Sequence, residues 1–451
     1  MKNLTTGSVF KNIIYFSLPY LLSYFLQTLY GMADLFIIGQ FETDISGTTA
    51  VSIGSQVMHM LTVMLVGLAM GSTVSIGQAI GANNKKLASA AVGNTITLFM
   101  LVSAALTALL LAFVKPIVSV MSTPQEAVSG TTAYLTICFI GIPFITAYNV
   151  ISSVFRGMGD SKSPMYFIAI ACGVNIALDY LFMGALKLGP AGAALGTTIS
   201  QAVSVIISLT VIVKRKMLSL LRSDLKPQKA VTSKLLKIGV PVALQDGFIQ
   251  VSFVIITVIA NNRSLTDSAA VGIVEKVIGF LFLVPSSMLS TVSALGAQNI
   301  GAGKQGRALQ TLKYACMISV GFGVVVCIIV QLMAEQIVGL FTPDQAVIVS
   351  GGQYLRGYIF DCVLAGIQFS FSGYFCACGK SQLSFLHNVL SIVFVRVPGA
   401  FFASKMYPNT LLPMGLASAA GSLLSSVICI LALCIILKNR REARLNAYGQ
   451  A

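Results

Sequence analysis

The sequence predicts an all-α polytopic membrane protein with twelve transmembrane helices in two pseudo-symmetric six-helix lobes. Three observations predict this fold class. Hydrophobic residues make up 56% of the 451 residues, and charged residues only 10%. Apolar runs of about 20 residues, long enough to cross a bilayer as a helix, recur along the whole chain. The second half of the chain also repeats short motifs of the first half.

The apolar segments define the helices in order along the chain. The mean hydropathy of +0.87 excludes a soluble chain of two or three domains, which is the usual organisation at this length. The expected spans are 13–39, 50–79, 89–114, 130–154, 164–186, 190–213, 236–260, 269–297, 309–334, 348–376, 383–404 and 413–437.

The charges between these segments predict the orientation. If the amino terminus is cytoplasmic, the external segments hold only Lys115, Lys187, Arg263 and Lys405, and the cytoplasmic ones hold most of the remaining lysines and arginines. This asymmetry follows the positive-inside rule. The net charge of +15 therefore indicates topology and contact with anionic membrane lipids, not binding of nucleic acid. We expect a multi-pass protein of the plasma membrane with both termini in the cytoplasm.

An internal repeat relates the two halves. The stretch "GQAIGANNKKLA" at 77–88 resembles "AQNIGAGKQGRA" at 297–308, and Tyr134 recurs as Tyr354. Each half holds six helices, an even number, so the repeats run parallel. Parallel repeats are a transporter architecture with the substrate pathway between them. The expected divisions are an amino-terminal lobe at 1–213, a basic linker at 214–235, a carboxy-terminal lobe at 236–437 and a basic tail at 438–451.

Two carboxylates in the first half are candidates for an ion site. Asp34 lies about 21 residues into the first helix and Asp179 about 15 residues into the fifth, so both reach the outer half of a core about 30 Å thick. Asn175 shares a helix face with Asp179, and Thr197 on the descending sixth helix falls at a similar depth. Ionisable groups inside a membrane are expensive and suggest function. These oxygens could hold one proton or a small hard cation.

The second half offers weaker candidates. Asp361 lies in the middle of its segment, and Gln368 extends the same helix face. Glu275 is adjacent to Lys276, which favours a structural pair, although a role in a second site stays open. Methionine-rich faces adapt to varied apolar ligands, while ordinary packing explains them equally well. The candidates for a substrate cleft are Gln27, Tyr30, Met32, Met64 and Gln368.

Several kinds of chemistry are excluded. The stretch "CGKS" at 378–381 lacks the upstream glycine of a P-loop, since Tyr374 stands there. "GMGD" at 157–160 is similar to the signature of intramembrane aspartyl proteases. Here it falls in a short turn, and no flanking helix supplies the partner aspartate that such a protease needs. We therefore expect no enzyme, no cofactor, and no metal beyond sodium at the carboxylate site. With no nucleotide-binding domain, an ion gradient remains as the energy source.

The chain resembles the multidrug and toxic compound extrusion (MATE) family over nearly its whole length. The segments that carry the resemblance are "LPYLLSYFLQTLYGMADLFIIGQF" at 18–41, "VSIGQAIGANN" at 74–84, "SSVFRGMGDSKSP" at 152–164, "NIALDYLFMGAL" at 175–186 and "AQNIGAGKQGRA" at 297–308. The resemblance implies two lobes around a central cleft, and export of cationic or lipophilic compounds by proton or sodium antiport. We expect the protein to be a monomer whose partners are small-molecule substrates and membrane lipids.

The resemblance also implies roles for particular residues. The amino-lobe cation site of the family matches Asp34, Asn175, Asp179 and Thr197. One branch of the family uses further carboxylates on helices ten and seven, which match Asp361 and Gln250 here. Because Gln250 is an amide, a second cation site stays open. The alternative function is a lipid-linked saccharide flippase of the same superfamily, although such proteins usually carry more helices and several cavity arginines.

Overall fold

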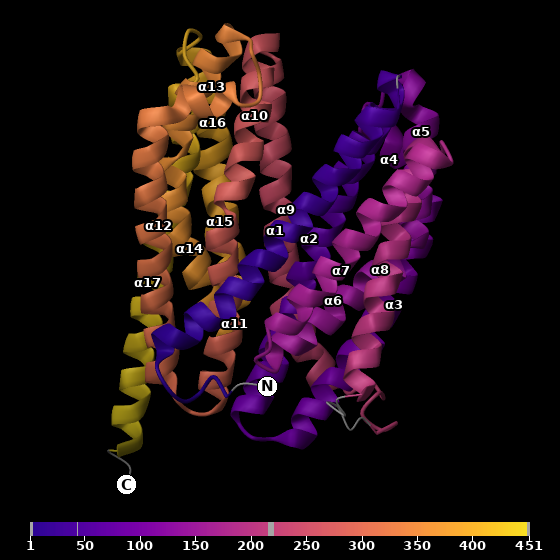
Figure 1. Ribbon diagram of the computed structural model, residues 1–451. Helices are drawn as coiled ribbons and strands as arrows, with labels where there is room; N and C mark the ends of the chain where they lie inside the picture. Colours follow the sequence, from indigo (N-terminus) through magenta and orange to yellow (C-terminus); the bar gives the residue numbers. More distant parts are fainter. Residues whose placement is uncertain (1–2, 43, 215–220, 449–451) are drawn as a thin grey trace. The chain divides into compact units, whose positions relative to one another are not determined.

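The protein is built from helices, and the computed structural model describes residues 3–42, 44–214 and 221–448 (Figure 1). No strand occurs within these residues. The helices of the first half are α1 (Val9–Phe41), α2 (Ile45–Gly81), α3 (Lys85–Ala112), α4 (Val114–Val120), η1 (Gln125–Ala127), α5 (Val128–Ile140), α6 (Ile142–Gly157), α7 (Lys162–Asp179), η2 (Tyr180–Ala185) and α8 (Gly189–Lys214). Those of the second half are α9 (Lys229–Asn261), α10 (Leu265–Leu281), α11 (Leu283–Gly301), α12 (Gln305–Gly339), α13 (Gln345–Tyr358), α14 (Phe360–Ala377), α15 (Ser381–Ser391), η3 (Ile392–Arg396), α16 (Val397–Met406) and α17 (Leu412–Tyr448).

The number of membrane-spanning segments agrees with the prediction of twelve. In the described part of the chain, eleven helical segments are long and apolar enough to cross a membrane, and α5 with α6 forms a twelfth that bends by 49°. The bend falls at Gly141, where Pro143 occupies the first turn of α6. Proline has no backbone N–H to continue the ladder of the preceding helix, which explains a break at this point.

The fifth segment of each half contains a π-helical turn. In the first half η2 directly follows Asp179, and in the second half η3 ends at Arg396. Such turns widen a helix locally and are frequent at functional sites. Each π-helical turn therefore lies beside an ionisable residue.

By their internal contacts, the helices form two compact units. The first unit comprises Met1–Ala243 and Ala297–Gln305, and the second comprises Leu244–Gly296 and Gly306–Ala451. The first turns of α9 and the carboxyl end of α11 thus pack with the first unit. Helix α9 begins at Lys229, inside the predicted linker, and α17 continues through most of the predicted tail to Tyr448. Residues 215–220 of the predicted linker lie outside the described residues.

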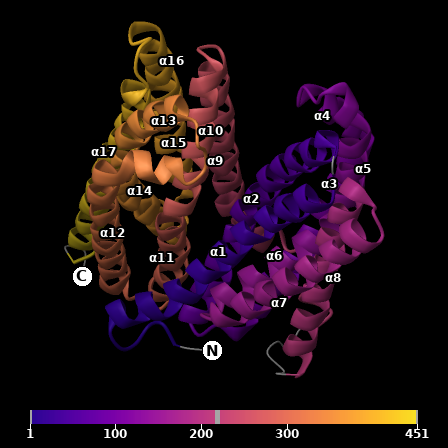
Figure 2. The same ribbon diagram turned by 45° about the horizontal axis from the view of Figure 1, so that its top comes forward.

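In the first unit, α2 packs along α6, and α7 packs between α1 and α8 (Figure 2). The residues that the repeat predicts to be structural are buried here. Ala50 and Val51 are inaccessible, and Tyr134 lies against Gly54 so closely that a Cβ there would stand 2.3 Å from its ring. Gly54 is therefore required for this packing of α2 on α5.

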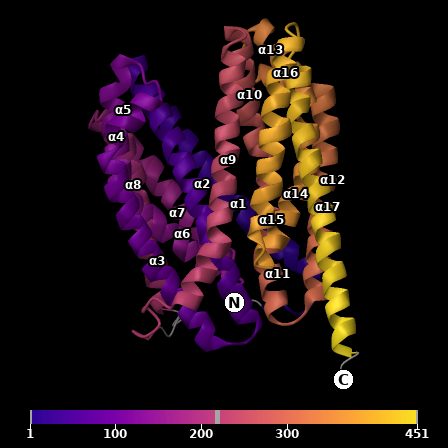
Figure 3. The ribbon, with the colours of Figure 1, turned by 180° about the vertical axis from the view of Figure 1, so that it is seen from behind.

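In the second unit, α17 packs along α13 and α14, and α10 packs on α13 (Figure 3). Its core contains the counterparts of the first unit's buried residues. Ala270 and Val271 correspond to Ala50 and Val51, Tyr354 corresponds to Tyr134, and all three are fully buried. The sequence repeat is thus also a repeat of core positions.

The repeat extends to the backbone. Asn83 and Gly303, which are 220 positions apart, both have positive φ angles, of 53° and 72°. Gly159 and Gly379, separated by the same interval, have φ angles of 85° and 71°. Left-handed conformations are uncommon and end helices in a specific direction. The two halves therefore share the turns that follow their second and fourth membrane segments.

Asn94 on α3 anchors the chain that precedes α9. Its side-chain amide donates to the carbonyl of Asp224 over 3.2 Å, and its Oδ1 accepts from the N–H of Gln228 over 2.6 Å. The Thr232 hydroxyl also donates to Asn94 Oδ1, over 3.1 Å. One buried side chain thus fixes the start of α9 against the first unit.

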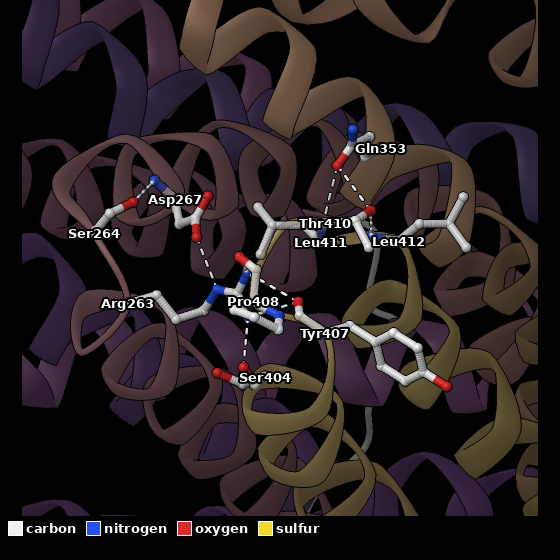
Figure 4. A network of polar contacts seen from close by, with 10 residues as sticks. All are labelled: Arg263, Ser264, Asp267, Gln353, Ser404, Tyr407, Pro408, Thr410, Leu411 and Leu412. Carbon is white, nitrogen blue, oxygen red and sulfur yellow. Dashed lines mark hydrogen bonds and ion pairs between the residues drawn. The ribbon is translucent and has the colours of Figure 1, made fainter.

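Arg263 joins two turns of the second unit (Figure 4). Its guanidinium forms a 2.7 Å ion pair with Asp267 and donates to the carbonyls of Ser404, Tyr407 and Pro408. Ser264 caps α10 beside it by accepting from the N–H of Asp267. The turn between α9 and α10 is therefore attached to the turn between α16 and α17.

Candidate cation site

The structure brings together the four residues predicted for the cation site in the first unit. Asp34 comes from α1, Asn175 and Asp179 come from α7, and Thr197 comes from α8. The Thr197 hydroxyl donates to Asp34 Oδ2 over 3.1 Å. The side chains of Asp179 and Asn175 lie near the Asp34 carboxyl group and act on it electrostatically. Residues separated by up to 163 positions therefore form one cluster.

Both carboxyl groups of the cluster are withdrawn from solvent. Asp34 is 2% exposed, and Asp179 is completely buried. Gly196 on α8 allows this arrangement, because a Cβ at that position would stand 2.2 Å from Asp179 Oδ1. The residue before Thr197 thus sets how closely Asp179 approaches α8.

Tyr30 completes the wall of the site. It lies about one helical turn before Asp34 on α1, and its hydroxyl donates to the Thr197 carbonyl over 2.9 Å. The same hydroxyl lies 2.6 Å from the Ser200 hydroxyl, which in turn donates to the Thr197 carbonyl. These bonds attach α1 to α8 at the level of the carboxyl pair.

Several buried polar atoms of the site have no hydrogen-bond partner. Among the described residues, the unpartnered atoms include Asp34 Oδ1, both carboxyl oxygens of Asp179 and both amide atoms of Asn175. Buried polar groups are normally satisfied, so such a concentration suggests that something else fills the site. Two ionised carboxylates are both acceptors, and a hydrogen bond between them requires a proton. A proton or a bound cation would remove the repulsion between them.

The donor set suits a monovalent cation. Carboxylate, amide and hydroxyl oxygens are hard ligands that suit alkali and alkaline-earth ions better than soft metals. Within the described residues, no group of three or more His, Cys, Asp or Glu side chains is arranged to hold a metal ion. The four side chains therefore present oxygen ligands of the kind that hard cations prefer.

The second unit has a different electrostatic arrangement. Asp361 on α14 is buried, and the side chains of Tyr358 and Ser422 lie near its carboxyl group and act on it electrostatically. Arg396, at the end of η3, donates to the Tyr358 hydroxyl, and its charge acts on both Asp361 and Glu275. The positive charge of Arg396 thus acts on both carboxylates, although neither lies within 4 Å of its guanidinium.

The remaining second-lobe candidates are placed around this cluster or apart from it. Glu275 on α10 accepts a hydrogen bond from Thr257 over 3.2 Å, and Gln368 donates to Ser422 over 2.9 Å. Gln250 is half-buried on α9 and makes no hydrogen bond with the described residues. Arg356 pairs with Glu335 at 3.0 Å and not with Asp361. A separation of five residues is unfavourable for a direct pair on one helix.

The substrate-cleft candidates of the first unit differ in their exposure. Tyr30 is buried at the cation site, and Gln27 lines a small pocket further along α1. Met32 is 46% exposed, whereas Met64 is half-buried. Their role in substrate binding stays a prediction.

The sequence interpretation missed three members of these clusters. Gly196 and Ser200 flank Thr197 within one turn, so the α8 face could have included them. Arg396 was interpreted with equal weight as a helix-terminus residue, because Pro398 follows it. Its proximity to Asp361 depends on the packing of η3 on α17 and of α17 on α14, for which the sequence contains no periodic signal.

Comparison with known proteins identifies the family. The MatE family model matches residues 19–181 and again 241–402, so each half of the chain matches once. "Probable multidrug resistance protein YoeA" of Bacillus subtilis is 28% identical over 405 residues, covering 88% of this chain and 87% of that protein. "Multidrug export protein MepA" of Staphylococcus aureus is 27% identical over 441 residues, covering 96% and 94%.

Solved structures share the fold. A crystal structure of MATE in complex with MaL6 superposes with a TM-score of 0.90 at 21% identity, covering 98% of this chain and all of that one. A MOP superfamily transporter from Pyrococcus furiosus gives a TM-score of 0.88 at 21% identity, covering 99% of both chains. With the family model matched across most of the sequence and relatives matched along nearly their whole length, the chain belongs to the MatE family of membrane transporters.

Proposed function

We propose that this transporter exports cationic or lipophilic compounds in exchange for a proton or a sodium ion. The buried carboxyl pair of Asp34 and Asp179, with its unpartnered oxygens, carries this proposal. Relatives that match nearly the whole chain are described as multidrug resistance and multidrug export proteins, which supports the substrate class.

The hydrogen bonds around Asp34 suggest how the ion would act on the helices. Thr197 donates to Asp34, and Tyr30 donates to the Thr197 carbonyl, so α1 and α8 are joined by the same residues that would hold the ion. A cation at Asp34 competes with these donors and weakens the attachment of α1. Pro19 interrupts the ladder of α1 nearer its start and provides a place to bend.

Ion entry and substrate export are coupled if each ligand binds the two states of the transporter with different affinity. An ion entering from outside favours the state in which substrate is released outward, and the return step carries substrate from the cytoplasm or the inner leaflet. Alternating access of this kind requires that ion and substrate bind the two states with different affinities.

Proteoliposomes provide the test. Drug uptake into the vesicles is measured under a pH gradient alone and under a sodium gradient alone. We expect one gradient to drive transport, and Asp34→Asn and Asp179→Asn each to reduce the driven rate at least tenfold. Asp44→Asn is the matched control, because Asp44 is an exposed N-cap of α2 and asparagine caps equally well. Exchange at the wild-type rate in both site variants would refute the assignment.

The topology and the rival function are tested in the same preparation. We propose that the protein acts as a monomer in the plasma membrane with both termini cytoplasmic, as the basic segments predict. Site-directed labelling of Lys85→Cys from one side of the membrane only would check this. The flippase alternative predicts movement of a fluorescent lipid-linked saccharide between leaflets, and drug movement without it favours the exporter.

A further inference from the structure

A second polar pocket lies in the first unit, away from the carboxyl pair. Its cavity volume is about 20 Å³. That is room for roughly one or two oxygen atoms. It shares no residue with the cation site, and Gln27 lies about 10 Å along α1 from Asp34. The pocket is lined by Tyr20, Ser23, Tyr24, Gln27, Val66, Tyr148, Asn149, Arg156 and Pro164.

Arg156 carries an uncompensated charge in this pocket. It is 8% exposed, yet in the described part of the chain no carboxylate lies within 4 Å of its guanidinium. Its contact is the ring of Tyr20, whose centroid lies 5.3 Å from the guanidinium carbon. The nearest acid in the sequence, Asp160, instead accepts hydrogen bonds from Lys162 and Ser163 at the start of α7.

The end of α6 does not supply the missing counter-charge. Arg156 lies in the last turn of that helix, where the macrodipole presents roughly half a negative charge. Half a charge shared by several carbonyls does not neutralise a buried guanidinium. The second unit has Cys376 at the corresponding position, so the repeat does not require a cation here.

Two other polar groups of the wall are satisfied by backbone carbonyls. The Ser23 hydroxyl donates to the Pro19 carbonyl over 2.9 Å, and the Asn149 amide donates to the Ile145 carbonyl over 2.9 Å. Tyr20 and Tyr24 pack edge to face at 5.1 Å and form an aromatic wall beside the guanidinium. The pocket therefore combines one unneutralised cation with rings.

We propose that this pocket binds the carboxylate of an aromatic substrate, with Arg156 as its counter-ion. The assignment rests on the proposed function and adds a substrate class to it. A guanidinium grips the two oxygens of a carboxylate in parallel, and the free space fits two oxygens better than the four of a phosphate. The free space holds only the carboxylate, so the ring of the substrate lies outside it, beside the half-buried Tyr24. The substrate is then zwitterionic or anionic as well as aromatic.

Binding of benzoate to the purified full-length protein tests this site without any transport. The chain contains no tryptophan, so Tyr24→Trp provides a single fluorescent reporter on the pocket wall. We expect benzoate to change its emission and benzyl alcohol to leave it unchanged. In this background, Arg156→Gln should weaken benzoate binding at least tenfold, and Arg156→Lys should weaken it less. Arg356→Gln removes an arginine that is already paired with Glu335 and should have no effect.

Further variants separate the possible outcomes. Ser23→Leu fills the free space of the pocket and keeps Arg156, so it should also abolish benzoate binding. This variant provides the test if Arg156→Gln fails to fold. Asp34→Asn should retain benzoate binding, which distinguishes this site from the proposed ion coupling. Benzoate affinity unchanged in both Arg156→Gln and Ser23→Leu would overturn the proposal. Inorganic phosphate and short-chain phosphatidylglycerol are tested as competitors of benzoate binding. If either displaces benzoate at a lower concentration than other aromatic carboxylates do, the proposal is also overturned.

Discussion

Gly81 and Gly301 occupy reciprocal positions where α2 meets the carboxyl end of α11 in the first unit. A Cβ at Gly81 would stand 1.9 Å from the Gln298 carbonyl oxygen, and a Cβ at Gly301 would stand 2.0 Å from the Gln78 carbonyl oxygen. These residues are repeat partners, 220 positions apart. The two copies of the repeated motif therefore pack on each other, and each glycine makes room for the backbone of the other copy.

This reciprocity predicts equal effects of alanine at the two positions. Because the obstructing atoms are backbone, neither Gly81→Ala nor Gly301→Ala can be accommodated by a side-chain rotation. We expect each to destabilise the protein by about 1–3 kcal/mol, and the double variant by less than the sum, since one separation of the helices relieves both overlaps. Thermal unfolding in detergent measures these effects.

A nearby glycine provides the control for that comparison. Gly306 begins α12, and a Cβ there would meet no atom within 4 Å. Gly306→Ala should leave stability unchanged or raise it slightly by restricting the unfolded chain. Unequal losses at Gly81 and Gly301 would contradict the reciprocal arrangement.

Gly196 predicts a variant that separates folding from ion coupling. Its missing Cβ faces Asp179 Oδ1, the end of a side chain that can rotate away. Gly196→Ala should therefore fold with near wild-type stability but displace Asp179 from Asp34, and reduce gradient-driven transport at least tenfold. Gly173→Ala on α7, where no atom lies within 4 Å, is the matched control. Full coupling in Gly196→Ala would show that the distance between the two carboxyl groups does not matter.

The guanidinium of Arg263 predicts a local loss of stability. Arg263→Met removes the ion pair with Asp267 and leaves the carbonyls of Ser404 and Pro408 without their donor. Hydrogen bonds to charged groups contribute about 1.5–3 kcal/mol each, and the side chain is only 9% exposed, so we expect a loss of about 2–4 kcal/mol. Arg263→Lys should recover part of it, because one ammonium cannot reach all the partners.

Limited proteolysis locates that effect. Cleavage near 404–408 should accelerate in Arg263→Met, and cleavage elsewhere should remain at the wild-type rate. A uniform acceleration along the chain would mean that the arginine stabilises the whole unit and not one turn.

The sequence was sufficient to predict the membrane-spanning helices because the thickness of the bilayer sets the minimum length of each apolar segment. About 20 apolar residues must be helical in lipid, whatever they pack against. The repeat was equally visible, and Ala50, Val51 and Tyr134 proved to be core residues with counterparts in the second unit. The grouping of Asp34 with Asp179 followed from depth alone, since helices of known direction place residues at calculable levels.

Contacts between distant residues were not predictable in the same way. The identity of Gly81 and Gly301 in the repeat did not reveal that they pack against each other's helices. The π-helical turns η2 and η3 have no sequence signal of their own, whereas the bend at Gly141 coincides with Pro143. For the same reason Arg396, a terminus candidate in the sequence, came to share a cluster with Asp361.

That cluster leads to a prediction about charge balance in the second unit. Arg396 is 8% exposed, lies 4.7 Å above the Phe253 ring and donates to Tyr358, which reaches Asp361. Removing a buried cation leaves its carboxylate partners uncompensated, which typically costs about 3–5 kcal/mol. Arg396→Gln should therefore lower stability strongly, whereas Arg396→Gln with Asp361→Asn should lose much less, because the double change removes both charges. Additive losses in this double-mutant cycle, measured by thermal unfolding, would show that the two groups do not compensate each other. Strong coupling would mean that Arg396 compensates the buried charge of Asp361 within the second unit.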